Sequence, residues 1–271
     1  MTASRPIALV TGGYKGIGNV AALALVKAGF EVVGTSRTTD GLTRRDGVRF
    51  FDLDVTSDES VALLVKRVVG QFGRIDVLVN NAGMGLSGAT EENSIAQTQN
   101  LFDINVFGLI RVTNAVLPHM RAQGSGRIIN LSSVFGFMPA PYMAAYSATK
   151  HAVEGYSESV DHEVRGHGIR VLIVEPGGTR TGFDDNTAPP DSPLETYAQQ
   201  RHTTSQVVAD EVNNGDDPAT VAKAIVAAAT DPKPKLRYPA GRRARQLSTM
   251  RRLVPARAFD KQLRKFNKFP V

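Results

Sequence analysis

Tyr146 and Lys150 lie four positions apart in the segment YSATKHAVEGYS, residues 146–157, which otherwise has the composition of an ordinary helix. Four positions along a helix are about 6 Å of rise and nearly a full turn, so the phenol and the ammonium share one face. A phenol has a pKa near 10, and a neighbouring cation typically lowers such a pKa by about 1 to 3. The spacing therefore predicts a tyrosine that donates and accepts a proton near neutral pH, with Lys150 lowering the pKa of its hydroxyl.

Two serines, Ser132 and Ser133, end the apolar segment GRIINLSS upstream of the tyrosine. A serine hydroxyl here would hydrogen-bond an oxygen on which negative charge develops, which is electrostatic stabilisation rather than nucleophilic attack. Taken singly, each residue also has a purely structural interpretation: Tyr146 as a half-buried aromatic, Ser133 as a helix cap and Lys150 as a solvated cation. Their combination favours acid–base chemistry.

A glycine-rich turn, TGGYKGIG at residues 11–18, follows the apolar run PIALV and precedes the helical pattern NVAALALVKAG. Gly12, Gly16 and Gly18 would let the backbone approach a pyrophosphate, whose charge is favoured by the free N–H groups and the dipole of a helix N-terminus. The spacing differs from the usual dinucleotide pattern, and a tight connection is the alternative. The order of strand, turn and helix favours phosphate binding.

The second predicted strand, EVVGTS, ends at Ser36 and is followed by Arg37. An NAD enzyme would present an acid here to the ribose 2′-hydroxyl, whereas a cation suits a 2′-phosphate. Arg37 and Lys15 of the glycine turn could clamp such a phosphate, or they could be two solvated surface cations. Two cations and no acid predict NADP(H) as the cofactor, with NAD(H) less favoured.

Short apolar strands alternate with helical patterns along the chain. The strand candidates are PIALV, EVVGTS, VRFFDLDV, IDVLVNNAG, GRIINLSS, IRVLIVEPGG and finally LRYPAG. Helical patterns between them include SDESVALLVKRVVGQFG, with Ser57 as its N-cap, and a long stretch around 97–121. Strands continuous in Val, Ile and Leu and separated by helices are typical of a parallel sheet covered on both faces. The sequence therefore predicts an α/β fold, a doubly wound parallel sheet of the Rossmann type.

From Gly182 to about Gly215 the pattern breaks into Asp, Asn, Thr, Pro and Gln. The segment DDNTAPPDSP within it is too rich in proline for a helix or an internal strand. Long loops that begin at a strand end commonly cover a ligand site, so we expect a substrate lid at about 182–215, with a plain surface excursion as the alternative. The segment DDPATVAKAIVAAATDP then predicts one more capped helix.

The composition is that of a soluble globular protein, because 42% of the 271 residues are apolar and 21% are charged. The length suits one large domain, and we expect a dinucleotide-binding and catalytic domain at 1–241 with a basic extension at 242–271. No apolar run approaches the roughly 20 residues of a spanning helix, and the N-terminus fits neither a secretory signal nor a transit peptide, so a cytoplasmic location is expected. With no cysteine and no metal-like spacing of the five histidines, no metal is expected.

The formal charge of +6 is unevenly distributed along the chain. Residues 233–271 hold 13 Lys and Arg against one acid, Asp260, so this end carries +12 and the rest of the chain carries −6. A basic, partly amphipathic end such as ARAFDKQLRKF could contact anionic lipid or nucleic acid, although such runs are usually solvated faces or partner contacts. We expect no nucleic-acid partner and keep contact with a membrane surface as the less favoured option.

Seven motifs in order resemble the classical short-chain dehydrogenase/reductases, over roughly residues 5–240. The motifs are TGGYKGIG, DLDVT, NNAG, INVFG, INLSSVFG, YSATK and EPGGTRT. A Tyr-x3-Lys pair alone proves little, but the ordered set identifies the chain as a member of this family. The basic C-terminal segment is similar to the ends of steroid- and retinoid-dehydrogenase-like members, which is a far less specific resemblance.

The resemblance implies a role for each matched residue. The family's catalytic serine stands 13 residues before the tyrosine, which selects Ser133 and makes Ser132 its structural neighbour. Lys150 would also hold the nicotinamide ribose, and Asn105 would support a proton-relay water next to it, or else would be a hydrogen bonder inside a helix. The expected cofactor contacts are Gly12, Tyr14, Lys15, Gly16, Ile17, Gly18, Arg37, Asp54, Val55, Asn81, Ala82, Gly83, Tyr146, Lys150, Pro176, Gly177, Thr179 and Thr181.

Two features bear on the substrate side. Thr179 stands where the family usually has an apolar β-branched residue, which would alter the nicotinamide contact slightly. The segment VFGFMPAPYM after Ser133 is apolar and aromatic and would line a pocket for a hydrophobic substrate, with Tyr142 as one polar contact. Plain core packing is the alternative for Phe135 and Phe137.

The residues and the resemblance together predict an NADP(H)-dependent oxidoreductase that interconverts a hydrophobic ketone or aldehyde and its alcohol by hydride transfer. Tyr146 would be the acid in carbonyl reduction and the base in the reverse reaction, where the charge of oxidised nicotinamide would add to that of Lys150. The alternatives are a non-catalytic dinucleotide-sensing or scaffolding protein and a membrane-associated dehydrogenase of lipid or steroid alcohols. Relatives commonly assemble through the helices around Gln97 and Tyr146, so a homodimer or homotetramer is expected.

Overall fold

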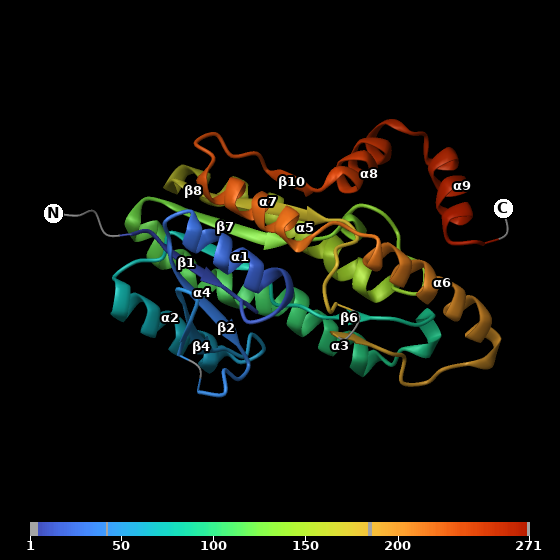
Figure 1. Cartoon of the computed structure of the whole chain (residues 1–271), viewed down its shortest axis with the longest axis horizontal. Helices are drawn as coiled ribbons and strands as arrows, with labels where there is room; N and C mark the ends of the chain where they lie inside the picture. The colour runs from blue at the N-terminus through green and yellow to red at the C-terminus, as the bar shows by residue number, and fades with distance from the viewer. Residues whose placement is uncertain (1–4, 42, 184–185, 270–271) are drawn as a thin grey trace.

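Eight strands form one twisted sheet at the centre of the molecule (Figure 1). The structure is a computed structural model that describes residues 5–41, 43–183 and 186–269. Seven strands run parallel, in the order β10 (Arg237–Ala240), β8 (Ile169–Pro176), β7 (Gly126–Leu131), β5 (Val77–Asn80), β1 (Ile7–Val10), β2 (Glu31–Ser36) and β4 (Val48–Asp52). The short strand β3 (Arg44–Arg45) is antiparallel to β4 at the edge. The sheet order reverses beside β1, where ligands bind in folds of this kind.

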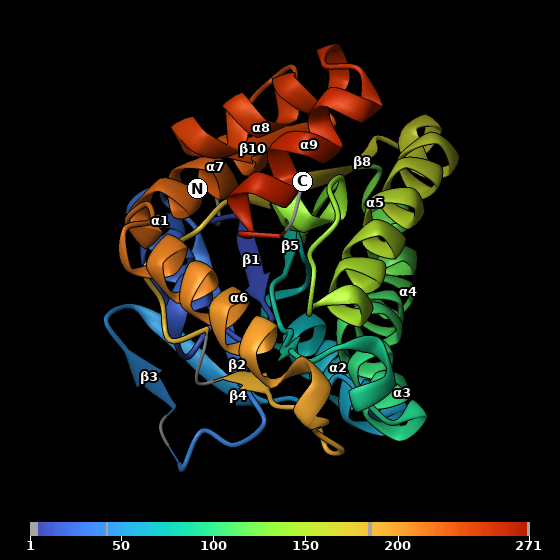
Figure 2. The ribbon, with the colours of Figure 1, turned by 90° about the vertical axis from the view of Figure 1, so that its right-hand side faces the viewer.

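Helices cover both faces of this sheet, as the continuous Val, Ile and Leu strands predicted (Figure 2). One face packs against α1 (Gly16–Lys27) and α7 (Pro218–Thr230). The other face packs against α2 (Asp58–Phe72), α4 (Gly108–Gln123) and α5 (Ala144–Val164). The predicted α/β fold with a doubly wound, mostly parallel sheet is confirmed. Short helical turns η1 (Thr90–Glu92), η3 (Val134–Gly136) and η4 (Arg165–His167) complete the connections.

Helix ends follow the predicted capping chemistry. Ser57 caps α2, because its hydroxyl accepts a hydrogen bond from the backbone N–H of Ser60 at 3.2 Å. Gly73 ends the same helix in the left-handed conformation, with φ of 77°, which a glycine adopts without the strain of a side chain. These caps place α2 so that its apolar face covers the sheet.

The stretch expected to be one helix around 97–121 is α3 (Ile95–Phe102), a π-helical turn η2 (Asp103–Phe107) and α4. By length and composition Ile95–Gln123 is apolar enough to cross a membrane, with a mean hydropathy of 1.3, which the sequence reading did not anticipate. Val112, Val116 and Met120 of this stretch are fully buried against the sheet, so its apolar character belongs to the protein core.

The predicted lid at 182–215 is only partly irregular. Its first half contains the two-residue strand β9 (Thr187–Ala188), which pairs with β6 (Gly85–Leu86), and its Asp184 and Asp185 lie outside the described residues. Its second half is the helix α6 (Glu195–Asn213), contrary to the expectation of a structureless insertion. The reason is that no Pro or Gly follows Pro193 until the helix has ended, so nothing interrupts its hydrogen bonding.

The basic C-terminal segment folds into two helices, α8 (Arg242–Leu253) and α9 (Ala256–Phe266). Their apolar side chains, including Ala244 and Phe259, are buried against Val134 and Met138 in the segment after β7. The ten lysines and arginines of residues 242–268 are exposed. The extension is therefore amphipathic, and its two helices lie over the carboxyl end of the sheet (Figures 1 and 2).

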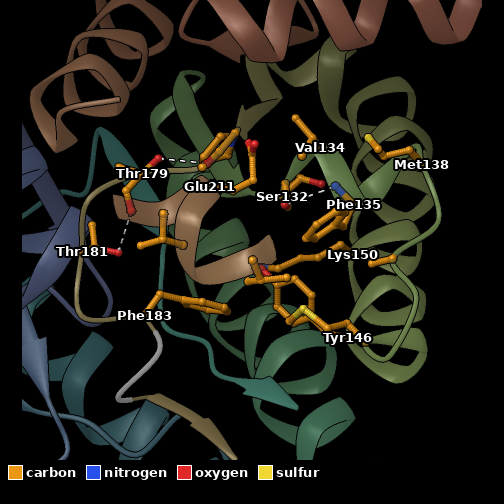
Figure 3. Close-up of a pocket in the computed structure, with 18 of the residues that line it drawn as sticks. Ser132, Val134, Phe135, Met138, Tyr146, Lys150, Thr179, Thr181, Phe183 and Glu211 are labelled. Carbon is orange, nitrogen blue, oxygen red and sulfur yellow. Dashed lines mark hydrogen bonds between the residues drawn. The ribbon is translucent and has the colours of Figure 1, made fainter. Parts of the chain in front are cut away.

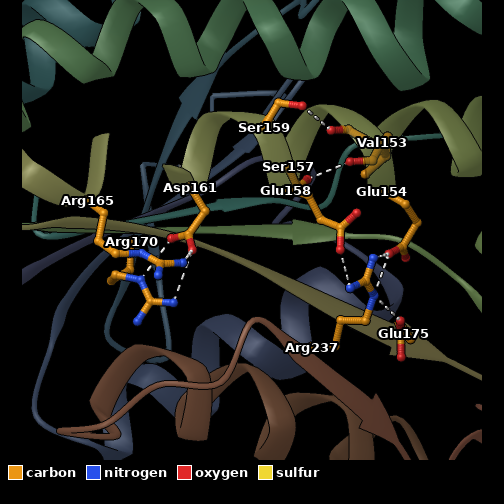
Figure 4. Close-up of polar contacts among 11 residues, drawn as sticks. Val153, Glu154, Ser157, Glu158, Ser159, Asp161, Arg165, Arg170, Glu175 and Arg237 are labelled. Carbon is orange, nitrogen blue, oxygen red and sulfur yellow. Dashed lines mark hydrogen bonds and ion pairs between the residues drawn. The ribbon is translucent and has the colours of Figure 1, made fainter. Parts of the chain in front are cut away.

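A buried carboxylate ties α5 to the sheet (Figure 4). The side chain of Asp161 is 1% exposed, accepts hydrogen bonds from Arg170 Nε at 2.8 Å and from the N–H of Val171 at 2.9 Å, and pairs with Arg165. Burial alone would raise the pKa of Asp161, but the hydrogen bonds from Arg170, Arg165 and Val171 together hold that pKa below its usual value. The carboxylate therefore stabilises the fold wherever it is ionised.

Replacing Asp161 by Asn is expected to lower the free energy of unfolding at pH 7 by about 2 kcal/mol, because the guanidinium groups lose their charged partner. A folded-state pKa that is depressed contributes stability above the unfolded-state value of about 3.9 and loses it as the pH falls through the folded-state value. The difference in the free energy of unfolding between the wild type and the variant should therefore become smaller below about pH 4. Urea unfolding at several pH values measures this, with the exposed Asp260→Asn as control; a deficit that persists unchanged in acid would contradict it.

Candidate active site

A cavity of about 880 Å³ lies at the carboxyl ends of the strands, between the glycine turn, α5, α6 and the helices α8 and α9 (Figure 3). Most of the residues selected from the sequence meet there. Those that line the cavity are Gly12, Lys15, Gly16, Ile17, Asn81, Ala82, Gly83, Ser133, Tyr146, Lys150, Pro176, Gly177, Thr179 and Thr181. They come from the ends of β1, β5, β7 and β8 and the starts of α1 and α5, which a parallel sheet brings to one edge.

Tyr146 and Lys150 lie side by side in this cavity (Figure 3), and Ser133 lines it with them. Lys150 Nζ lies 5.6 Å from the centroid of the Tyr146 ring, and it donates a hydrogen bond to the carbonyl oxygen of Leu131 at 2.9 Å. The Tyr146 hydroxyl is hydrogen-bonded to the side chain of Ser133. Ser133 also caps the turn η3, because its hydroxyl accepts the N–H of Phe135 at 3.2 Å. The cap considered from the sequence is thus observed, and the hydrogen bond from Ser133 to a substrate oxygen stays a prediction.

Burial dominates the titration of this cluster. It raises the pKa of Tyr146 above its ordinary value, against the opposing effect of the Ser133 hydrogen bond. It lowers the pKa of Lys150 to about 8, against the carboxylate of Glu154, which raises it. The expected depression of the phenol pKa by Lys150 is thus outweighed by burial, because removing a phenolate from water costs more than a cation at this distance returns. Tyr146 is therefore held as a protonated acid.

Asn105 is buried beside this cluster but does not line the cavity. It lies in the π-helical turn η2, a local irregularity that is frequent at functional sites. Its amide accepts from the N–H of Met84 and donates to the carbonyl of Met84, both at 2.9 Å, and approaches the Thr149 hydroxyl at 3.3 Å. The amide is therefore engaged within the protein, and the role expected for Asn105 in a proton relay stays a prediction.

The glycine turn fits a dinucleotide pyrophosphate. Gly12 and Gly16 have φ of 64° and 53°, in the region that favours glycine, and a Cβ on Gly18 would lie 2.9 Å from the carbonyl carbon of Gly12. Lys15, the N-cap of α1, makes no side-chain capping bond, so the first N–H groups of this helix face the cavity without a side-chain acceptor. Such free N–H groups and the helix dipole favour a bound phosphate.

Five of the predicted cofactor residues lie outside the cavity lining: Tyr14, Gly18, Arg37, Asp54 and Val55. Arg37 is exposed, and Asp54 accepts hydrogen bonds from the N–H and the hydroxyl of Thr56 at 2.9 and 2.7 Å. These hydrogen bonds lower the pKa of Asp54, and the charge of Arg37 lowers it further. Arg37 and Asp54 are thus neighbours, beside the ends of β2 and β4.

Arg45 supports the glycine turn and was not anticipated from the sequence. Its guanidinium lies 4.9 Å from the ring centroid of Tyr14 and donates to the Tyr14 carbonyl at 3.2 Å and to Asn19 Oδ1 at 3.0 Å. Tyr14 in turn packs edge-on against Phe50, with ring centroids 5.5 Å apart. No sequence motif predicts this contact, because Arg45 lies on the edge strand β3, 31 positions after Tyr14.

The remaining lining of the cavity is mostly apolar and comes from three segments that the sequence did not connect. The segment after β7, the helix α6 and the helices α8 and α9 contribute Phe135, Met138, Met143, Val207, Val208, Leu247, Phe259, Leu263 and Phe266. Tyr142, predicted as a polar substrate contact, is not part of this lining. Its ring packs against Tyr197 and Phe269, with centroids 6.3 and 6.4 Å apart, so it joins the lid to the C-terminal segment. Phe137 packs in the core beneath α8 and α9, while Phe135 lines the cavity.

The segment 182–215, called the lid here after its predicted role, is held at its neck and at the start of α6. At its neck, Thr179 and Asp216 form a bridge, and the Thr179 hydroxyl donates to the carbonyl of Gly177 at 3.0 Å. At the start of α6, the buried carboxylate of Glu92 accepts the N–H of Leu194 at 2.8 Å and pairs with Arg201. Burial alone would raise the pKa of Glu92, but backbone hydrogen bonds and Arg201 together lower it. The lid is therefore anchored by an ionised carboxylate, which the sequence did not single out.

Across the described ranges, no group of three or more His, Asp or Glu side chains could hold a metal ion. The cavity contains hydroxyls, an ammonium and backbone N–H groups. That combination suits proton transfer beside a bound phosphate-containing cofactor.

Comparison with known proteins agrees with this geometry. A family model described as short chain dehydrogenase matches residues 6–191. The chain belongs to the short-chain dehydrogenases. A short-chain dehydrogenase from Streptomyces avermitilis has a crystal structure with a TM-score of 0.85 and 38% identity, covering 99% of both chains.

Two further short-chain dehydrogenase relatives bear on function. A 3-ketodihydrosphingosine reductase of Bacteroides thetaiotaomicron is 38% identical over 237 residues, 87% of this chain and 87% of the relative. A metagenomic short-chain oxidoreductase in complex with NADP is 27% identical, with a TM-score of 0.68, covering 86% of this chain and 95% of that one. Because the chain belongs to this family, it is an oxidoreductase of the short-chain dehydrogenase type.

Proposed function

We propose that this short-chain dehydrogenase is an NADP(H)-dependent enzyme that interconverts hydrophobic ketones or aldehydes and their alcohols, with Tyr146 as the general acid and base. The observation that carries the proposal is that the Ser133–Tyr146 pair and Lys150 share one cavity with the glycine turn. When bound there, the nicotinamide supplies or accepts the hydride. Ser133 donates a hydrogen bond to the substrate oxygen, and Tyr146 gives that oxygen a proton in reduction or takes it in oxidation.

Tyr146 is protonated at neutral pH, as a proton donor in carbonyl reduction must be. A phenol whose pKa lies above its ordinary value rests in the protonated state that a proton donor requires. The apolar walls from α6, α8 and α9 favour a hydrophobic substrate over a sugar or a small polar alcohol. The relative named as a reductase of a keto lipid agrees with both points.

Turnover separates this function from a dinucleotide-sensing role. A panel of ketones of increasing hydrophobicity, mixed with the protein and NADPH, should lead to NADPH consumption that follows each ketone reduced. Binding of NADPH without consumption by any ketone or aldehyde of the panel would refute the proposal in favour of a sensor.

The preference for NADP(H) is supported by Arg37 and Lys15, which stand near the expected place of the 2′-phosphate, and by the relative that binds NADP. Replacing Arg37 by Asp is expected to lower kcat/KM for NADPH by about 30-fold, because a charged hydrogen bond is lost and a repulsive carboxylate is gained. The value for NADH should change little, so the preference reverses. Steady-state kinetics with both cofactors measure this.

The matched control for Arg37→Asp is Arg44→Asp. Arg44 is an exposed arginine of the neighbouring edge strand β3, and its substitution changes the net charge by the same amount. If the ratio of kcat/KM for NADPH to kcat/KM for NADH is the same in both variants, the effect comes from overall charge. Binding of the 2′-phosphate by Arg37 would then be refuted.

A further inference from the structure

A group of buried acids lies behind the catalytic cluster, between α5, β8 and β10 (Figure 4). Arg237 Nη2 lies 3.0 Å from Glu154 Oε2, and Arg237 Nε lies 3.2 Å from Glu175 Oε1. A third carboxylate, Glu158, pairs with Arg237 Nη1 at 2.6 Å. The side chains of Glu154 and Glu175 are 8% and 1% exposed, whereas that of Glu158 is 45% exposed. One guanidinium thus faces two buried carboxyl groups and one solvated carboxylate.

One carboxyl oxygen of this group lacks a partner. Within the part of the chain that the structure describes, Glu175 Oε2 is buried without a hydrogen bond, whereas the side chain of Glu154 is hydrogen-bonded to the Ser132 hydroxyl. Buried polar atoms are nearly always paired, so this free carboxyl oxygen calls for a physical explanation. Two buried carboxyl groups that share the guanidinium of Arg237 are the arrangement in which a pair of acids binds one proton.

The pKa shifts of the two acids also favour a single proton on the pair. Burial raises the pKa of Glu175 to about 7, and the charge of Glu154 raises it further, against Arg237 and the more distant Arg252 of α8. Burial likewise raises the pKa of Glu154. Ionising both carboxyl groups would place two like charges in the interior around one guanidinium that already pairs with Glu158, and burying each charge costs several kcal/mol.

The same group adjoins the catalytic lysine. Glu154 follows Lys150 by one turn of α5, and its carboxylate opposes the loss of the lysine proton. Ser132 precedes the catalytic Ser133, and Glu175 precedes the cavity residue Pro176. The buried acids are thus one residue or one helical turn away from the groups that line the active-site cavity.

We propose that Glu154 and Glu175 share one proton at neutral pH and that the single negative charge that the pair retains holds Lys150 as an ammonium while Tyr146 transfers its proton. The pair consists of positioning residues, because neither carboxyl group lines the cavity. The effect on turnover rests on the function proposed above, but the shared proton does not. The charged groups facing the pair are Lys150, Glu158 and His162 on α5, Arg237 on β10 and Arg252 on α8.

Infrared spectroscopy tests the shared proton without turnover. The wild-type protein at pH 7 should show the carbonyl stretch of a protonated carboxylic acid, and the single variants Glu154→Gln and Glu175→Gln should both lose it, because the remaining acid ionises beside Arg237. Glu158→Gln, which removes the solvated partner of the same arginine, should keep it. Absence of the band in the wild type, or its survival in one of the two single variants, would overturn the sharing.

The pH profile of kcat for ketone reduction by NADPH tests the link to Lys150. In the double variant Glu154→Gln/Glu175→Gln, the alkaline limb should move about one pH unit lower, so kcat at about pH 9 falls about tenfold while kcat at about pH 6 is kept. Glu158→Gln should follow the wild type. If the double variant does not fold, Glu154→Gln alone should shift the limb in the same direction by a smaller amount, which lowers kcat at about pH 9 by about threefold.

The outcomes of the two experiments separate the two proposals. A double variant whose profile overlays that of Glu158→Gln would show that the acids only join α5, β8 and β10, and the inference would be wrong. A wild type that shows the infrared band but reduces no ketone would refute the proposed function and leave the shared proton standing.

Discussion

Replacing Tyr146 by Phe is expected to lower kcat by about 1000-fold while changing the Kd for NADPH by no more than about threefold. The hydroxyl is the only group of this side chain that can transfer a proton, and general acid catalysis by a positioned group contributes about 100- to 10,000-fold. The ring itself contacts Phe135 and Phe183, at centroid distances of 6.4 and 5.5 Å, and a phenylalanine preserves these contacts. Stopped-flow and steady-state measurements with NADPH and a reducible ketone separate rate from binding.

The matched control for Tyr146→Phe is Tyr156→Phe. Tyr156 lies ten positions further along α5 and packs against the core on the sheet side rather than lining the cavity. Its substitution should leave kcat within about twofold, since no reacting group is removed. Equal losses in the two variants, or a loss of NADPH affinity as large as the loss of rate in Tyr146→Phe, would contradict the role of Tyr146 as the proton donor.

Replacing Gly18 by Ala is expected to raise the Kd for NADPH about 100-fold, the cost of misplacing binding groups by about 1 Å. A Cβ at Gly18 would lie 2.9 Å from the carbonyl carbon of Gly12 and 2.5 Å from Asn81 Nδ2. Asn81 Nδ2 donates hydrogen bonds to the carbonyls of Thr11 and Gly12 at 2.9 and 3.2 Å, so the turn cannot yield without losing them. The start of α1 and the turn must therefore separate, which removes the N–H groups from the phosphate. Titration of NADPH fluorescence measures the Kd.

The control for Gly18→Ala is Gly155→Ala, at a helical glycine where a Cβ would meet no atom within 4 Å. That substitution should leave the Kd unchanged and stabilise α5 by about 0.5 to 1 kcal/mol. An unchanged Kd in Gly18→Ala would show that the turn tolerates the extra carbon and that the close approach of α1 is not needed for cofactor binding.

Local patterns were sufficient to predict the sheet, its helices, the glycine turn and the grouping of Ser133, Tyr146 and Lys150. The alternation of apolar runs predicted the strands, and Ser57 predicted the start of α2, because both depend on interactions within a few residues. The spacing of Tyr146 and Lys150 predicted their shared face for the same reason. The carboxyl edge of a parallel sheet then brings these segments together without further information.

Other parts of the site could not be predicted from the sequence, because they depend on contacts between segments that are far apart along the chain. Arg45 reaches the glycine turn only through the edge strand β3, and Glu92 meets Arg201 across more than 100 residues. Tyr142 was predicted to contact the substrate because its segment is apolar and aromatic. In the structure its ring packs between Tyr197 of α6 and Phe269 of the C-terminal segment instead. The pKa of Tyr146 was expected to fall, but burial, which no local pattern reveals, raises it.

By itself the sequence determined which chemistry the chain carries: the phenol, the ammonium, the hydroxyl and the glycine turn, each recognisable from its spacing because helices and strands have fixed periods. The tertiary structure alone decided the environment of that chemistry. It placed α8 and α9 as an apolar wall rather than a solvated tail, and it placed Glu154, Glu175 and Arg237 together behind Lys150. The physical reason is that burial and charge pairing act through space, between side chains that the chain order keeps far apart.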